Sequence, residues 1–280
     1  MKPFLGIDLT YNKKNEQTNG ADLLCCKPSA ALAQALDAAT GKAQSSVEKS
    51  MLPPVFRVIQ WVCGIGGLII ASGIIKGLGE VTVKQAYQNA PYLFWVAGGC
   101  LAIWGTLKLL GTHKAKTVLG NEESISAFSN YEGICNAIYT ELSVPADAQE
   151  MDIIVFRYKE KDNEIKPVMK GMENTPYYNL SFKVFSDAEN LYVANLEGKY
   201  AIPLNAIQTI RTENKRIALL SWNKEEHFSE GRYKPYKLTA NNYGNVFCKP
   251  YHILEFIHND ETWGIWFPAY ELPILEESTK

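Results

Sequence analysis

Two long apolar runs in the N-terminal half restrict what this chain can fold into. The first, Val58–Ile75, has no charged residue and is about 18 residues long, the length at which an α-helix crosses the hydrocarbon of a bilayer. The second, Tyr92–Gly111, has Lys108 as its single charge, near an end where a lysine reaches the headgroups. We therefore expect a transmembrane helical hairpin over residues 55–111. A hydrophobic hairpin buried inside a soluble fold is the alternative.

The glycines of the first run, Gly64–Gly67, also raise the question of a phosphate-binding loop. A dinucleotide loop needs a third glycine where this sequence has Ile69, and the Gly-Lys-Ser/Thr of a P-loop does not follow. A helical contact fits better, because Cys63, Gly67 and Ala71 recur every four residues and share one face. The run is therefore interpreted as half of a membrane anchor.

Further small residues repeat this spacing. Gly73 and Gly77 form one pair, and Gly98, Ala102 and Thr106 form a face on the second run. Small residues let membrane helices approach closely. These faces are expected to hold the two helices together and to offer a contact for a homo-oligomer.

The basic residues around the runs predict an orientation. Five flank the hairpin and two lie in or beside its connector: Lys49, Arg57, Lys108, Lys114 and Lys116, against Lys76 and Lys84. Because lysine and arginine accumulate on the cytoplasmic side, both termini are expected in the cytoplasm of a two-span cell-membrane protein.

Helices are also expected on either side of the hairpin. Residues 1–54 form a cytosolic N-terminal segment, partly flexible, with a short alanine-rich helix before Gly41. That helix either packs on the rest of the protein or binds a partner. Residues 112–148 form a helical connector, with Asn121 as its N-cap and Glu122 and Glu123 in the first turn.

From residue 149 the apolar period changes to two. Stretches such as "DIIVFRYKEKD", "NLYVANLEGKYAIPL", "YHILEFIH" and "TWGIWFP" are typical of short strands between polar turns. Residues 149–280 are therefore expected to form an antiparallel β-barrel or sandwich with a short C-terminal helix after Pro268. The whole chain is classed as an α+β membrane protein.

Composition and motifs argue against several functions. The net charge of −2 gives no electrostatic footprint for nucleic acid. The six cysteines include no CxxC pair, and His252 and His258 would lie about 20 Å apart along one strand, so no metal site is expected. The catalytic motifs of hydrolases, zinc proteases and kinases are missing from the sequence. We expect neither an enzyme nor a cofactor.

One resemblance appears within residues 150–280. The stretches "GKYAIPLNAIQTIRTENKRIALLSWNK" and "GIWFPAYEL" resemble bacterial membrane-tethered pleckstrin-homology-like (PH-like) domain proteins of unknown function. The resemblance rests on the strand order, the Ile-Pro-Leu turn and the closing step from strand to helix. It implies a curved barrel capped by a C-terminal helix and used to bind lipid or protein.

Two basic groups in this region are candidate contacts for a lipid or a protein partner. Arg211, Lys215 and Arg216 would cluster at a hairpin turn, and a second group comprises Arg232, Lys234 and Lys237. Basic residues near a membrane are attracted to anionic lipids. A solvated face is the alternative reading, because glutamates such as Glu213 and Glu230 lie nearby.

The sequence thus predicts an integral membrane protein that presents a cytosolic PH-like β domain for binding protein or lipid headgroups. Its partners would be membrane lipids and a membrane or cytosolic protein, and no nucleic acid. A structural subunit of a transport or envelope-assembly complex is one alternative. A peripheral enzyme with a buried apolar hairpin is another.

Overall fold

The computed structural model describes residues 1–8, 21–77, 82–154, 157–162, 164–168, 181–220, 228–236, 238–240 and 245–278. The chain divides into two units. We call Met1–Ala33 with Cys135–Lys280 the β-rich unit, and Gln34–Ile134 the helical unit.

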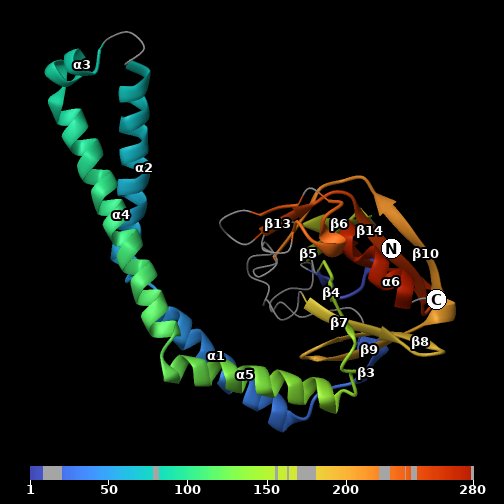
Figure 1. Cartoon of the computed structure of the whole chain (residues 1–280). Helices are drawn as coiled ribbons and strands as arrows, with labels where there is room; N and C mark the ends of the chain where they lie inside the picture. The colour runs from blue at the N-terminus through green and yellow to red at the C-terminus, as the bar shows by residue number, and fades with distance from the viewer. Residues whose placement is uncertain are drawn as a thin grey trace. The chain divides into compact units, whose positions relative to one another are not determined.

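The helical unit is dominated by a pair of long helices. Helix α2, Pro54–Gly77, and helix α4, Pro91–Leu119, lie side by side, and the short α3, Val83–Asn89, lies where the chain turns between them (Figure 1). Thr82 caps α3, and its side chain and that of Gln85 bond reciprocally to each other's backbone N–H groups. Both long helices are long and apolar enough to cross a membrane, as the two predicted runs require.

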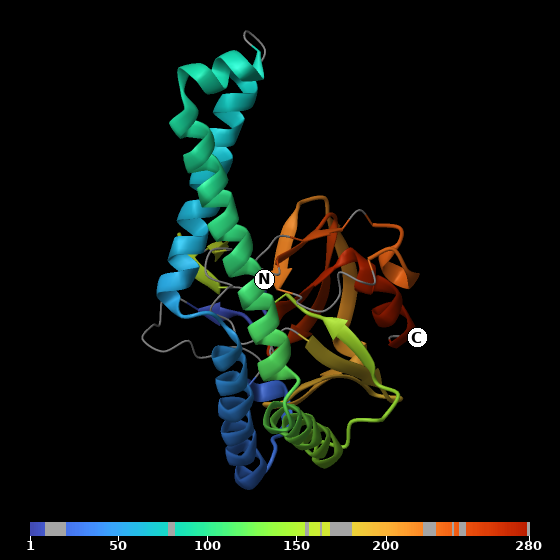
Figure 2. The same cartoon turned by 60° about the vertical axis from the view of Figure 1, so that its left-hand side comes forward.

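Two further helices, α1 and α5, adjoin this pair along the chain. Helix α1, Ala30–Ser50, leads toward α2, and α5, Glu122–Glu141, follows α4 (Figure 2). The predicted cap of α5 is confirmed, since Asn121 Oδ1 accepts a hydrogen bond of 2.7 Å from the Ser124 N–H. The predicted short helix before Gly41 is longer than expected. It continues through Gly41, because alanines and other good helix formers surround that residue.

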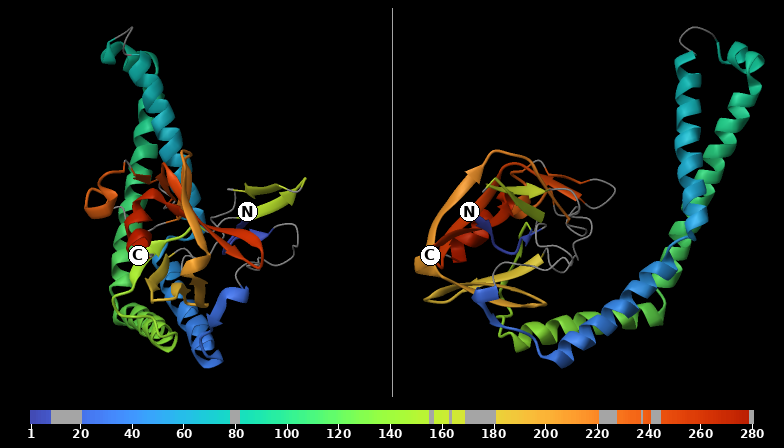
Figure 3. Two further views of the ribbon diagram at one scale, coloured as in Figure 1. Left: turned by 90° about the vertical axis from the view of Figure 1, so that its right-hand side faces the viewer. Right: turned by 180° about the vertical axis from the view of Figure 1, so that it is seen from behind.

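The described residues of the β-rich unit form four sheets (Figure 3). The larger two have the orders β1-β15-β14-β10 and β3-β9-β8-β7-β4, and the smaller two are β2-β5-β6 and β11-β13-β12. The strands are β1 Lys2–Pro3, β2 Ile7–Asp8, β3 Leu24–Cys26, β4 Gln149–Asp152, β5 Arg157–Lys161, β6 Glu164–Val168, β7 Ser181–Ser186, β8 Asn190–Asn195, β9 Gly198–Pro203, β10 Ile207–Glu213, β11 Ile217–Leu220, β12 Thr239–Ala240, β13 Asn245–Cys248, β14 Tyr251–His258 and β15 Glu261–Pro268.

One core joins the two larger sheets. Alternate residues of β7, β8, β14 and β15 point into it, as the period of two requires. They are Phe182 and Val184, Leu191 and Val193, Leu254 and Phe256, and Ile265 and Phe267. The C-terminal helix α6, Leu272–Ser278, adds Ile274 and Leu275. A mixed helical and sheet fold is therefore confirmed.

The expected closed barrel is not found among the described strands, which form separate open sheets. The chain changes sheet at a one-turn 3-10 helix, η4, Leu204–Ala206, between β9 and β10. Strand β10 then pairs with β14, whereas β11 pairs with β13. Because β10 and β11 belong to different sheets, the expected hairpin between them does not form. Arg211 lies on β10 itself, and Lys215 and Arg216 lie on the crossover between the sheets.

The N-terminal residues differ most from the expected boundaries. Phe4 and Leu5 are buried in the core of the β-rich unit, with β1 parallel to β15 and β3 antiparallel to β9. The segment 1–54 is therefore split between the two units rather than forming a separate tail. Strands of two or three residues are too short to show an alternating pattern, and only distant partners stabilise them.

Candidate functional site

The outward faces of α2 and α4 are apolar and exposed. Only 11% of the most apolar window of α2 and 6% of that of α4 are buried within the protein. Trp95 and Leu109, for example, are 73% and 74% exposed. Soluble proteins rarely expose continuous apolar surface on this scale. The two helices are therefore unlike the core helices of a soluble fold.

Two glycines of α2 form its contact with α4. A side-chain carbon at Gly64 would lie 2.7 Å from Cδ1 of Trp104, and one at Gly67 would lie 3.1 Å from the Leu101 side chain. Both glycines are buried. A β-carbon at Gly64 would overlap the indole and one at Gly67 would press against the leucine, so glycine lets the two helices approach this closely.

Other small residues of the hairpin face outward. A side-chain carbon at Gly66, Gly73 or Gly98 would meet nothing within 4 Å, and Ala102 and Thr106 are exposed. The predicted face through Gly67 thus holds the hairpin together, whereas the Gly98 face does not contact α2. An oligomer through the outward residues stays a prediction.

Two members of the first predicted basic group, Arg211 and Lys215, pair with glutamates. Arg211 Nε donates to Glu255 Oε1 over 2.7 Å, and a terminal nitrogen of Arg211 pairs with Glu213. The bond to Glu255 raises the pKa of Arg211. Lys215 Nζ lies 3.8 Å from the other oxygen of Glu213. Arg216 instead stacks its guanidinium 4.1 Å from the centre of the Phe247 ring.

The second predicted basic group does not form a shared surface. Arg232 turns inward and pairs with the fully buried Glu271, whereas Lys234 is exposed. Lys237 lies outside the described residues. Arg232 therefore stabilises the fold, and Lys234 is the described member of this group that faces solvent.

Arg232 belongs to a buried polar network that sequence reasoning did not identify. Its Nε lies 3.0 Å from Glu271 Oε2 as an ion pair rather than an aligned hydrogen bond, and a terminal nitrogen donates to the Glu150 carbonyl over 3.0 Å. Glu271 Oε1 accepts the Asp152 N–H over 3.0 Å. The Tyr270 hydroxyl donates to Asp152 Oδ2 over 2.8 Å. The network joins β4, the one-turn η6 (Gly231–Tyr233) and η7 (Ala269–Glu271).

The surroundings of this network are apolar and aromatic. Burial, followed by the charges of Asp152 and Glu271, raises the pKa of Tyr270 well above its usual range. Burial also raises the pKa of the Cys248 thiol, and thiols in such surroundings are unreactive. Tyr236 donates its hydroxyl to the Ala269 carbonyl over 3.0 Å. We infer that the network holds residues 228–236 against the rest of the β-rich unit.

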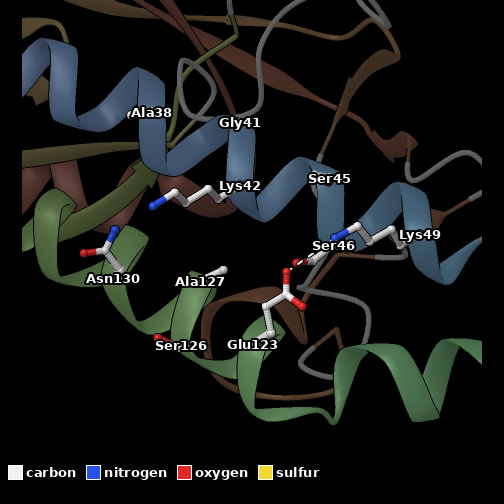
Figure 4. Close-up of a pocket in the computed structure, with 10 residues that line it drawn as sticks. All are labelled: Ala38, Gly41, Lys42, Ser45, Ser46, Lys49, Glu123, Ser126, Ala127 and Asn130. Atoms are coloured by element: carbon white, nitrogen blue, oxygen red, sulfur yellow. Dashed lines mark hydrogen bonds and ion pairs between the residues drawn. The ribbon is translucent and has the colours of Figure 1, made fainter.

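A polar groove in the helical unit is the best candidate for a ligand site. It has a volume of about 720 Å³ and is lined by one face of α1 and the first turns of α5 (Figure 4). Lys42 and Asn130 appear at one end, and the ion pair of Lys49 with Glu123 lies at the other. The partner-binding alternative for the helix before Gly41 was the nearest prediction, but the groove needs both helices. The serines and alanines shared by both stretches were the sequence signal that could have indicated the groove.

Three comparisons with known proteins give no match to this chain: no protein-family model, no curated protein and no solved structure. The resemblance to PH-like domains therefore stays a prediction that rests on the quoted stretches.

Proposed function

We propose that this chain is an integral membrane protein in which α2 and α4 form a two-span anchor and the β-rich unit is a binding module outside the bilayer. One observation carries the proposal: the apolar side chains of both helices face outward along their length. Leaving that surface in water would be costly, since each exposed apolar side chain forgoes about 1.5–3 kcal/mol of burial.

The flanks of the hairpin support a membrane boundary. Lys114 Nζ donates to the Met51 carbonyl over 2.7 Å, and Leu52 lies against Gly111. These contacts join the residues just before α2 to the C-terminal end of the apolar run in α4. Arg57, Lys114 and Lys116 lie at this end. They support cytoplasmic placement of the flanks, because lysine and arginine accumulate on that side.

The binding role is proposed for the β-rich unit as a PH-like module that contacts protein or lipid headgroups. Its basic residues Arg211 and Lys215 already face carboxylates, which makes a purely electrostatic lipid surface at those positions less favourable. A protein partner is the better-supported ligand of this unit. The soluble-hairpin alternative is disfavoured by the low burial of α2 and α4.

Extraction of membranes tests the anchor. The full-length protein should remain in the pellet after alkaline carbonate treatment and should dissolve in mild detergent. A variant with Leu68→Arg and Ile69→Arg carries two charges in the middle of α2, each costing about 2.5–3.5 kcal/mol at a helix centre. It should shift toward the soluble fraction. Release of the unmodified protein by carbonate alone would refute the anchor.

Labelling with a membrane-impermeant maleimide tests the orientation. In intact cells Thr82→Cys should react, and Asp147→Cys should react only after the cells are opened. Mass spectrometry of the labelled peptides separates these sites from the native cysteines. Reaction of Asp147→Cys in intact cells would reverse the proposed topology.

A further inference from the structure

The groove between α1 and α5 exists because small side chains face each other there. Ala38, Gly41 and Ser45 recur on α1 at intervals of three and four, and Ala127 faces them from α5. Nothing lies within 4 Å of a side-chain carbon placed at Gly41. The helices therefore leave a space between them, and at about 720 Å³ it falls in the size range of small-molecule sites.

The charges at the groove favour an anion. Lys42 forms no ion pair with any described residue, and its ammonium group extends along the groove near Asn130 (Figure 4). Lys49 is paired with Glu123 over 3.4 Å, but both side chains are largely exposed. Exposed pairs of this kind contribute little and exchange partners readily. The two lysines and one glutamate leave an excess of one positive charge.

Hydroxyl and amide groups supply further donors at the same place. Ser45 and Ser46 lie between the two lysines on α1, and Ser46 is only 5% exposed. Asn130 adds an amide from α5. Phosphate oxygens accept several hydrogen bonds at once and are bound by lysine as a point charge. Ammonium, hydroxyl and amide donors in one groove therefore match a phosphate group.

We propose that this groove binds a phosphate-bearing anion, either the headgroup of an anionic phospholipid or a free phosphate ester. The lipid source rests on the proposed membrane anchor, whereas the free ester does not. Lys49, at the near end of the groove, is three residues from Leu52, which lies against Gly111 at the end of the apolar run. Both sources can therefore reach it.

Native mass spectrometry of the detergent-solubilised full-length protein tests the proposal. One arm adds phosphatidylglycerol, with phosphatidylcholine as its comparison, and the other adds glycerol 3-phosphate without lipid. Lys42→Gln should weaken retention of the phosphate ligand about fivefold, the effect of losing one lysine near an anionic group. Lys42→Arg should preserve it.

Two further variants keep the test interpretable. Gly41→Leu should occupy part of the groove beside Lys42 and weaken retention, and a side-chain carbon at this position meets nothing within 4 Å. Lys159→Gln removes an exposed lysine of β5, outside the groove and in the β-rich unit rather than in the hairpin, and should leave retention unchanged. Sensitivity to both groove variants in the lipid arm identifies a headgroup, and sensitivity in the ester arm identifies a free phosphate.

Retention that is equal in Gly41→Leu, Lys42→Gln and the unmodified protein would overturn the groove proposal in either arm. Membrane extraction of the same variants separates this result from failure of the anchor. A groove variant that remains in the carbonate pellet but loses phosphate supports both proposals. If carbonate releases every variant, the anchor is refuted. The glycerol 3-phosphate arm alone then tests whether the groove binds phosphate.

Discussion

Tyr270 donates its phenolic hydrogen to Asp152 Oδ2 over 2.8 Å, between two residues that are 1% and 2% exposed and 118 positions apart in the chain. The adjacent Glu271 bonds the Asp152 backbone N–H from the same short turn. These two bonds attach η7 to β4 and bring two carboxylates into one buried region. The β-rich unit therefore depends on polar contacts within its core as well as on apolar packing.

Replacing Tyr270 with phenylalanine should lower the free energy of unfolding by about 1–3 kcal/mol, because the buried carboxylate of Asp152 loses a donor. Chemical unfolding in mild detergent, followed by tryptophan fluorescence, measures the change. Tyr192→Phe is the matched control, since it removes a 2.8 Å bond to the exposed Asp187 and should cost less. Equal losses in the two variants would contradict the proposed importance of the buried bond.

Replacing Arg232 with methionine should destabilise the β-rich unit by roughly 3 kcal/mol. This is the lower end of the range for breaking a buried pair, because the guanidinium is partly exposed while Glu271 is fully buried. Lys234→Met, two positions away on the exposed surface, should have little effect.

The double variant Arg232→Met with Glu271→Leu tests the cause of that loss. It removes both charges and should recover part of the stability relative to Arg232→Met alone, since no unpaired carboxylate remains. A double variant that is as unstable as the sum of its parts would show that the two charges do not stabilise each other.

Gly64→Ala should destabilise the hairpin by about 1–3 kcal/mol, the usual cost of adding a carbon to filled space. The new carbon would meet the Trp104 indole at 2.7 Å. Gly66→Ala, two positions away, points into open space and should be neutral or slightly stabilising. Thermal unfolding of both variants in detergent gives the comparison. Equal melting temperatures would refute the contact between Gly64 and Trp104.

His252 should make stability depend on pH. Burial lowers the pKa of this histidine, and the weaker effect of Glu276 opposes the shift. The unfolded chain therefore takes up a proton more readily than the folded one. The stability from neutral His252 is present above the unfolded pKa of about 6.5 and is lost as the pH falls below it.

A His252→Gln variant should retain more of its neutral-pH stability when the pH falls from 7 to 5 than the unmodified protein does. Unfolding midpoints measured across this range provide the test. Glutamine can keep a polar contact with Thr212, whose hydroxyl lies 3.0 Å from His252 Nδ1. Identical pH slopes in the two proteins would exclude His252 as the titrating group.

Local pattern explains why parts of the fold could be predicted. The charge-free run Val58–Ile75 needs no distant partner to be helical, and Asn121 caps a helix from within its own turn. The alternation of Leu254 and Phe256 on β14 likewise marks one buried face. In each case the signal and the structure lie within a few residues of each other.

The candidate sites could not be predicted in the same way. Arg211 looks like part of a basic surface in the sequence, but pairing of β10 with β14 brings Glu255 against it. Arg232 looks exposed until the turn after β15 supplies Glu271. Charge neutralisation by residues far along the chain has no local signature.

The sequence by itself determined the two apolar helices, the helices next to them and the switch to short strands, because hydrophobic period and capping act over a few residues. Only the tertiary structure decided that Phe4 and Leu5 complete the β core, that Tyr270 and Glu271 meet Asp152, and that small faces of α1 and α5 leave a groove beside Lys42. Those features join segments more than 70 residues apart, so they depend on how the elements pack together.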